Sequence, residues 1–303
     1  MAARDDPMPV FPAAEEGKNM SGTFVKTTGP AIVEIIAVGN ELLNGSVRDG
    51  NSFWLIERIM DLGGVVGRVS ILPDDQDLVA QEVRTALGRA VGKPPEVLLL
   101  TGGLGPTVDD LTVAAVAQGM GLPLVMHDQA REMIRRAYDD LAAQGVIAQG
   151  GLNPPREKMA LLPQGATALA NPAGTAPGVL VHAEAAIVVC FPGVPREMEQ
   201  IFETSLQPHL TGLFPAMRHA RRGLLIHGND ESALAPYLQR FAERYPAIHV
   251  KARSGIIAEN PRLEFLFSTT ARDRDAAEAL LQVAMDELRV WLEAGGVGVG
   301  EAG

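Results

Sequence analysis

The sequence has a single cysteine, Cys190, in 303 residues. One thiol can form neither a disulfide framework within the chain nor a zinc site with several thiolates, so both are excluded and a reducing compartment suits the protein. The six histidines show no pair at the spacing of metal ligands, which argues against a histidine-based zinc site. We therefore expect a fold that depends on packing rather than on cross-links.

Aromatic rings and positive charge are also scarce. Aromatic residues make up 5% of the chain, and the formal net charge is −11. Few rings leave few platforms for stacked bases, and an acidic surface repels a phosphate backbone. Direct nucleic-acid binding is therefore not expected. We interpret the basic cluster of Arg218, Arg221 and Arg222 as a solvated face rather than an RNA contact, since no Gly-x-x-Gly loop accompanies it.

Long hydrophobic runs are absent as well. The longest, residues 185–191, falls far short of the ~18 apolar residues that a membrane span needs. The N-terminus lacks the apolar core of a secretory signal, so we expect a cytoplasmic protein with no membrane partner. Residues 1–29 mix prolines and charges without any period, which predicts a disordered leader.

From residue 31 the hydrophobic pattern alternates between strands and helices. Nearly continuous apolar runs at 32–38, 96–101 and 185–191 are typical of strands buried on both faces of a parallel sheet. Segments with helical spacing lie between them. The order predicts an α/β domain over residues 30–211, with a mostly parallel sheet between two layers of helices.

A second, smaller domain is expected over residues 212–303. The stretch from Pro208 to His219 has two prolines, a glycine and no sustained period, which indicates a boundary. Strand and helix patterns after it predict a small α+β domain with the element order of a KH domain. Residues 295–303 are expected to be a frayed tail.

The loop of residues 101–110, Thr-Gly-Gly-Leu-Gly-Pro-Thr-Val-Asp-Asp, is the strongest candidate for a ligand site. Three glycines after a buried strand let the backbone approach a ligand, and free N–H groups can bind an anion. No lysine of the P-loop kind is present, and Asp109 and Asp110 would repel a bare phosphate. A divalent cation would resolve that conflict, since magnesium is commonly held by carboxylates and substrate oxygens. Alternatively, the two carboxylates only complement the dipole of the next helix.

Two further loops could line the same crevice. The first predicted strand ends in Gly39-Asn-Glu-Leu-Leu, and ligands in open parallel sheets collect at the carboxyl ends of strands. Glu41 is then a candidate polar contact. Asn51 is either a ligand contact or the N-cap of its helix. The loop of residues 171–178 is either a third wall or a simple turn.

Residues 39–43, 101–110, 171–178 and 191–198 together resemble, in that order, the amino-terminal half of the CinA competence/damage-inducible family. That half is similar in turn to the molybdopterin-binding domain of the MoaB, MogA and MoeA proteins, in which a glycine loop holds the pterin phosphate. The resemblance implies a three-layer α/β/α molybdopterin-binding-like fold. Full-length CinA proteins continue into a nicotinamide-nucleotide deamidase domain, and we assign no deamidase activity to this chain.

The resemblance also implies a function and a set of site residues. It implies a hydrolase, a nucleotide pyrophosphatase for ADP-ribose-like diphosphates that depends on magnesium or cobalt, and a dimer or trimer. The alternative is a non-catalytic module that binds a nucleotide or molybdopterin. Asp109, Asp110 and Glu41 are the predicted catalytic residues, and Asp109, Asp110 and Asp49 the predicted metal ligands. The predicted ligand contacts are Gly39, Asn51, Thr101, Gly102, Gly103, Gly105, Thr107, Asn153, Lys158, Asn171, Gly174 and Thr175.

Overall fold

The computed structural model describes residues 31–89, 94–184, 186–210, 213–214, 218–227, 231–255, 262–271 and 273–301. The expected leader, residues 1–29, lies outside the described residues. The described chain divides into two compact units. The first comprises residues 32–52 and 67–213, and the second comprises Phe53–Val66 and the residues from Phe214 onward.

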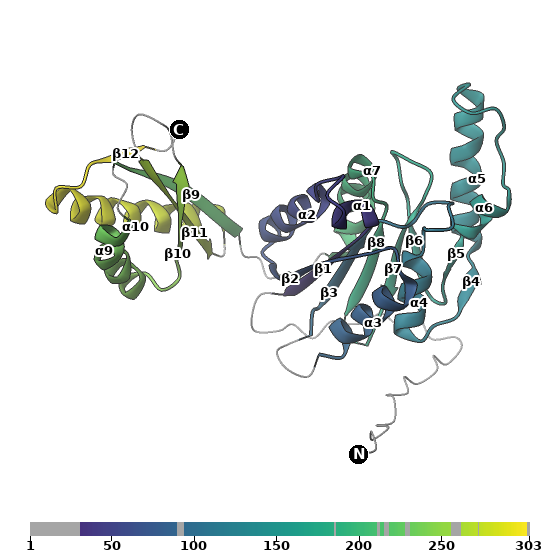
Figure 1. The fold of residues 1–303 in the computed structure, drawn as a ribbon, viewed down its shortest axis with the longest axis horizontal. Coiled ribbons are helices and arrows are strands. Elements are labelled where there is room, and N and C mark those ends of the chain that lie inside the picture. The colour runs from purple at the N-terminus through teal and green to yellow at the C-terminus, as the bar shows by residue number, and fades with distance from the viewer. Residues whose placement is uncertain are drawn as a thin grey trace, which may run out of the picture. The chain divides into compact units, whose positions relative to one another are not determined.

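A six-stranded sheet forms the centre of the first unit (Figure 1). Its order is β2-β1-β3-β8-β7-β6. β1, β3 and β8 are parallel neighbours, whereas β7 is antiparallel to both of its neighbours, β8 and β6. The predicted sheet is confirmed, and the apolar runs at its centre are buried throughout β3 and β8. The strands are β1 (Ile32–Val38), β2 (Val65–Leu72), β3 (Val97–Thr101), β6 (Thr167–Leu169), β7 (Gly178–His182) and β8 (Ile187–Phe191).

Helices cover both faces of this sheet. Successive strand residues point to opposite faces, so Leu98 and Val188 pack with α3 (Gln76–Leu87) and α4 (Thr112–Met120) in one core. On the opposite face the rings of Phe191 and Phe202 lie 6.4 Å apart, which places α7 (Pro195–Gln200) and its π-helical continuation η1 (Ile201–Leu206) there. α8 (Gln207–Leu210) continues the same run. The three-layer α/β/α prediction is confirmed.

Several short elements complete the first unit. They are α1 (Asn40–Leu43), the antiparallel pair β4 (Leu124–Met126) and β5 (Leu161–Pro163), and α6 (Pro154–Lys158). Each is too short to leave a periodic signal, so the sequence did not predict them. The longer α5 (Asp128–Ala143) stands out from the sheet with α6 beside it (Figure 1). α2 (Gly50–Asp61), whose residues from Phe53 onward belong to the second unit, buries Leu55 and Ile59 completely.

The second unit is a small α+β fold, as predicted. Its antiparallel sheet has the order β10-β11-β9-β12, and Phe241 packs edge-on against Phe267 at 5.3 Å in the core. The elements are β9 (Arg218–His227), α9 (Glu231–Arg244), β10 (His249–Gly255), β11 (Arg262–Ala271), α10 (Arg274–Ala294) and β12 (Val299–Glu301). No helix of the described residues is long and apolar enough to cross a membrane.

The prediction of a frayed tail is wrong for residues 299–301. Gly296, at φ 77°, follows the end of α10, and the N–H of Val297 donates to the Leu292 carbonyl, a glycine-dependent way of ending a helix. The chain then runs back along the sheet, and Val299 pairs with Ile226 of β9. Gly295 and Gly296 therefore form the turn that leads from α10 into the edge strand β12.

Gly119 allows α3 and α4 to approach closely. A Cβ at this position would lie 2.8 Å from the Ala80 carbonyl oxygen and 2.9 Å from the Val83 Cβ, so the backbone would have to shift. We expect Gly119→Ala to lower the free energy of unfolding by about 1–3 kcal/mol, the usual cost of overpacking. Gly50→Ala, in α2, has nothing within 4 Å of the added Cβ and is the control. Denaturant unfolding measures both, and a Gly119→Ala variant as stable as wild type would contradict this packing.

Candidate functional site

The loop of residues 102–111, here called the Gly102 loop, joins β3 to α4 at the carboxyl end of the parallel strands. Gly102 and Gly103 have φ values of 105° and 68°, a region that residues with side chains rarely adopt. A Cβ on Gly102 would overlap the Val38 carbonyl oxygen, and one on Gly103 would overlap the Thr112 hydroxyl. Both glycines are therefore required by conformation and by space.

Asn51 fastens the base of the Gly102 loop. Its Nδ2 donates to Thr101 Oγ1 at 2.8 Å and to the Gly193 carbonyl at 2.9 Å, and Asn51 is only 8% exposed. The N-cap interpretation of Asn51 is wrong, because α2 begins at Gly50 and the Asp49 carboxylate accepts from the Ser52 N–H at 2.9 Å instead. Asn51 thus ties the ends of two strands together, and Asp49 is engaged at the start of α2.

Asp109 and Asp110 lie in a turn that Thr107 closes. The Thr107 N–H donates to Asp110 Oδ2 at 2.8 Å, and the Thr107 hydroxyl is within hydrogen-bond distance of both carboxylates. One hydroxyl hydrogen serves two acceptors, so it can donate to only one at a time. This hydroxyl is the main reason that the pKa of Asp109 lies below its usual value, and the charge of Lys158 adds to the effect.

The two carboxylates precede α4 rather than open it. α4 begins at Thr112, and its first turn contains no acidic residue. Because the helix-dipole effect falls off within the first turn, the dipole interpretation of these side chains loses support. Gly105 lies directly beside them, since a Cβ there would be 2.6 Å from Asp110 Oδ2. The glycine thus leaves room for a carboxylate that folds against the loop.

α6 brings Lys158 to the same loop. The Lys158 ammonium group donates to the Thr107 carbonyl oxygen. Burial lowers the pKa of Lys158 more than the nearby Asp110 and Asp109 carboxylates raise it. Asn153 does not approach the loop in this way: its Oδ1 accepts from the Arg156 N–H at 3.0 Å and so caps α6. Two negative charges, on Asp109 and Asp110, and one positive charge, on Lys158, therefore lie close together at this loop.

The loop of residues 171–177, here called the Asn171 loop, rests on α7. Asn171 Nδ2 donates to Glu197 Oε2 at 2.6 Å, and a Cβ on Gly174 would overlap the Glu197 carboxyl group. Thr175 Oγ1 donates to the Tyr138 hydroxyl at 3.4 Å. Burial raises the pKa of Glu197, and the Asn171 hydrogen bond partly offsets that shift. Glu197 was not predicted as a site residue, although it stands in the motif at 191–198.

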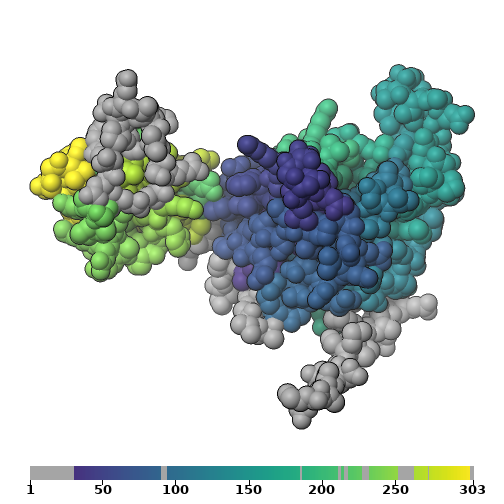
Figure 2. Space-filling model, in the orientation of Figure 1, coloured from purple at the N-terminus to yellow at the C-terminus, as the bar shows by residue number. Residues whose placement is uncertain are grey.

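Glu41, another of the predicted catalytic residues, is exposed, as Asp109 is. It lies on α1, which stands on the surface of the first unit (Figure 2). Its side chain folds back over Gly39, where a Cβ would be 2.5 Å from Glu41 Oε1. Gly39 therefore makes room for this carboxylate at the end of β1.

The metal ligands predicted from the sequence do not form a closed cage. Within the described ranges, no three His, Cys, Asp or Glu side chains gather in a group that could hold a metal ion. Asp109 and Asp110 share one turn, whereas Asp49 accepts a hydrogen bond at the start of α2. The donor set fits an ion of the magnesium type, which takes one or two carboxylates and completes its shell with ligand oxygens and water.

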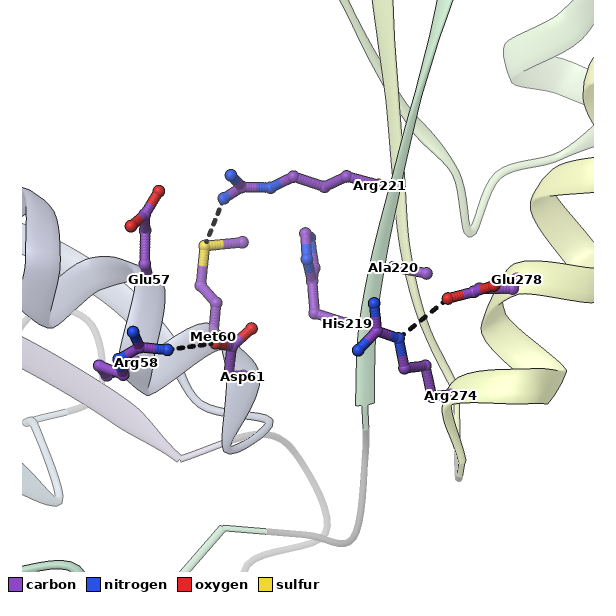
Figure 3. Close-up of a pocket in the computed structure, with 9 residues that line it drawn as sticks. All are labelled: Glu57, Arg58, Met60, Asp61, His219, Ala220, Arg221, Arg274 and Glu278. Carbon is purple, nitrogen blue, oxygen red and sulfur yellow. Dashed lines mark hydrogen bonds and ion pairs between the residues drawn. The ribbon is translucent and has the colours of Figure 1, made fainter. Parts of the chain in front are cut away.

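A hollow of about 340 Å³ lies elsewhere, in the second unit (Figure 3). Its charged groups are largely paired with one another, as in Arg58 with Asp61 at 3.2 Å and Arg274 with Glu278 at 2.9 Å. None of the predicted site residues lines it, so it is no substitute for the Gly102 loop. The residues around it are Glu57, Arg58, Met60, Asp61, His219, Ala220, Arg221, Arg274 and Glu278.

Known proteins resemble this chain across both units. Residues 34–212 match the family model described as a probable molybdopterin binding domain. A protein of Pyrobaculum aerophilum is 37% identical over 255 residues, which are 84% of this chain and 91% of the relative. A protein of Aeropyrum pernix is 40% identical over 270 residues, 88% of this chain and 96% of the relative.

A solved structure supports the same assignment. The crystal structure of the protein CinA from Thermoplasma acidophilum, whose function is unknown, is 32% identical with a TM-score of 0.52. It covers 59% of this chain and 98% of that protein. The resemblance predicted from the four motifs is confirmed.

The Thr107 hydroxyl offers a direct test of the turn that holds the two carboxylates. Thr107→Val removes the donor that favours the ionised form of Asp109, so the pKa of Asp109 should rise toward its usual value. Thr107→Ser keeps the hydroxyl and should leave that pKa in place. NMR titration of the carboxyl carbon measures the midpoint, and an unchanged midpoint in Thr107→Val would show that the hydroxyl does not act on Asp109.

Proposed function

Because the chain belongs to the probable molybdopterin binding domain family, matched over residues 34–212, we propose that it binds a phosphorylated small molecule at the Gly102 loop. The proposed activity is hydrolysis of a nucleotide diphosphate of the ADP-ribose type with a divalent metal ion. The observation that carries the proposal is the turn in which Thr107 holds Asp109 and Asp110 beside Gly105.

The Gly102 loop supplies the binding surface for a diphosphate. Gly102 and Gly103 adopt backbone conformations that only glycine takes easily, and a loop without side chains lets phosphate oxygens approach backbone N–H groups. Lys158 adds a positive charge at Thr107, on the same loop. Together these groups favour an anionic ligand even though two carboxylates stand nearby.

Asp109 and Asp110 are the residues that would hold the metal ion, and a bound divalent ion would polarise the phosphate and activate water. Asp109 stays ionised at neutral pH in this proposal, in keeping with its lowered pKa. Thr107 orients both carboxylates by donating its N–H to Asp110 and its hydroxyl to Asp109. Glu41, at the end of β1, is the proposed group that orients the attacking water.

The reaction balances without an oxidant or reductant. The oxygen of a water molecule bonds to one phosphorus, the bridging P–O bond of the diphosphate breaks, and the bridging oxygen leaves with the other phosphate. A proton from water is released or taken up by a nearby carboxylate. ADP-ribose would yield AMP and ribose 5-phosphate.

A second candidate is a binding module that does not turn its ligand over. It is favoured by the finding that the described residues contain no group of three side chains suited to a metal ion. In that case the same crevice would hold a nucleotide or a pterin, with Lys158 balancing part of the charge. The two candidates share the ligand surface and differ only in chemistry.

Incubation of the purified chain with ADP-ribose and either magnesium or cobalt separates the candidates. Chromatography that detects AMP supports the hydrolase. Calorimetric binding of ADP-ribose without any AMP formation supports the binding module instead. Absence of both binding and product for ADP-ribose would refute the assignment of this ligand class.

Asp109→Asn and Asp110→Asn test the metal ligands. If the carboxylates hold a metal ion, either change removes one of its ligands. Magnesium-dependent binding of ADP-ribose should fall by more than about tenfold. If they only complement a helix dipole, each change should cost roughly 0.3–1 kcal/mol of stability and leave binding alone.

Asp128→Asn is the matched control for these variants. Asp128 is exposed and lies in the first turn of α5, so it shares the position next to a helix start without any part in the Gly102 loop. Its change should leave binding unaltered. Wild-type affinity and wild-type magnesium dependence in both Asp109→Asn and Asp110→Asn would contradict the proposed metal site.

A further inference from the structure

Glu197 makes two contacts with the Asn171 loop. It lies in the first turn of α7, which begins at Pro195. Its Oε2 accepts a hydrogen bond of 2.6 Å from Asn171 Nδ2, and its carboxyl group lies against the Cα of Gly174. Asn171 is the first residue of the loop and Gly174 lies in its middle, so one side chain contacts the loop at two separate places.

The carboxamide of Asn171 is committed to this arrangement. Its Oδ1 accepts from the Ala173 N–H at 3.1 Å, and its Nδ2 donates to the Ala176 carbonyl at 2.8 Å as well as to Glu197. An amide nitrogen carries two hydrogens, and both are used. Asn171 therefore has no N–H left for a ligand unless the loop opens, so its role differs from the ligand contact predicted from the sequence.

Gly174 is required by space rather than by backbone conformation. Its φ is outside the left-handed region, in contrast to Gly102 and Gly103, so an alanine could adopt its backbone. A Cβ there would overlap the Glu197 carboxyl group, which is the far end of a flexible side chain. A methyl group at position 174 would therefore displace the carboxylate and leave the loop backbone free of any direct clash.

We propose that Glu197 is a positioning residue: it holds the Asn171 loop in its ligand-binding shape by accepting the Asn171 hydrogen bond and by packing on Gly174. The inference rests on the proposed function, since the Asn171 loop is taken as one wall of that site. The loop then offers its backbone and Thr175 to the ligand, while Asn171 and Glu197 keep the shape. Glu197 is half-buried, which fits a side chain that lies against the loop.

Three variants separate the parts of this arrangement. Glu197→Gln keeps an oxygen that can accept from Asn171, Glu197→Ala removes it, and Gly174→Ala pushes the carboxylate away without altering Glu197. Glu199→Ala is the control, because Glu199 lies on the same helix and its side chain makes no hydrogen bond to another described residue. Each variant is made in the full chain.

Hydrogen exchange of residues 171–177 without ligand is the first measurement. A hydrogen bond to a charged acceptor contributes enough that its loss should speed exchange in this loop by about tenfold or more in Glu197→Ala and Gly174→Ala. Glu197→Gln and Glu199→Ala should exchange as wild type does. Exchange in the strands of the first unit should not change, which distinguishes a local effect from general unfolding.

Binding of ADP-ribose with magnesium is the second measurement. Affinity should fall by about tenfold in Glu197→Ala and in Gly174→Ala and be restored in Glu197→Gln. Wild-type exchange of residues 171–177 in both Glu197→Ala and Gly174→Ala would overturn the proposal, and so would a Glu197→Gln variant as impaired as Glu197→Ala. If wild type binds no ADP-ribose, the proposed function fails on its own, while the exchange experiment still decides the role of Glu197.

Discussion

The close approach of Gly102 to the end of β1 is the constraint on which the candidate site depends. The Gly102 Cα lies so near the Val38 carbonyl that no side chain fits, and its N–H donates to the Phe191 carbonyl of β8 at 3.0 Å. One residue therefore ties together the ends of three parallel strands. Because parallel strands end at the same edge of a sheet, the loops after β1, β3 and β8 are brought to one place. Every residue of the Gly102 loop takes its position from that point.

Most polar side chains predicted as ligand contacts, and Asp49 among the predicted metal ligands, hold the protein itself. Asp49 and Asn153 cap helices, Asn51 joins the ends of β3 and β8, and Asn171 closes its own loop. The reason is general: strand and helix ends leave backbone groups without partners, and Asp and Asn are suited to pair with them. Such residues hold the loops of the candidate site in place. The groups left to contact a ligand are the loop backbone and the charges of Asp109, Asp110 and Lys158.

The sequence predicted the fold well where its signal is long. The buried strands and the amphipathic α5 and α10 extend over enough residues to show a period, and the glycine loop follows a strand in an order that few folds share. α1, α6 and the β4–β5 pair are shorter than any useful window. Contacts between distant positions left no pattern either: Asn171 and Glu197 are 26 residues apart, and the pairing of Val299 with Ile226 depends on the tertiary fold.

The tight packing of α4 against α3 at Gly119 limits which parts of the candidate site can move. α4 follows the Gly102 loop directly, and it is interlocked with α3 at a distance that allows no added methyl group. A helix seated this closely behaves as a stiff support, because a packed interface resists sliding. Any adjustment to an incoming molecule should then occur in residues 103–111 and in the short α6, whose Lys158 contacts Thr107, rather than in α4. The candidate site therefore combines a loop that can adjust with a helix that is packed in place.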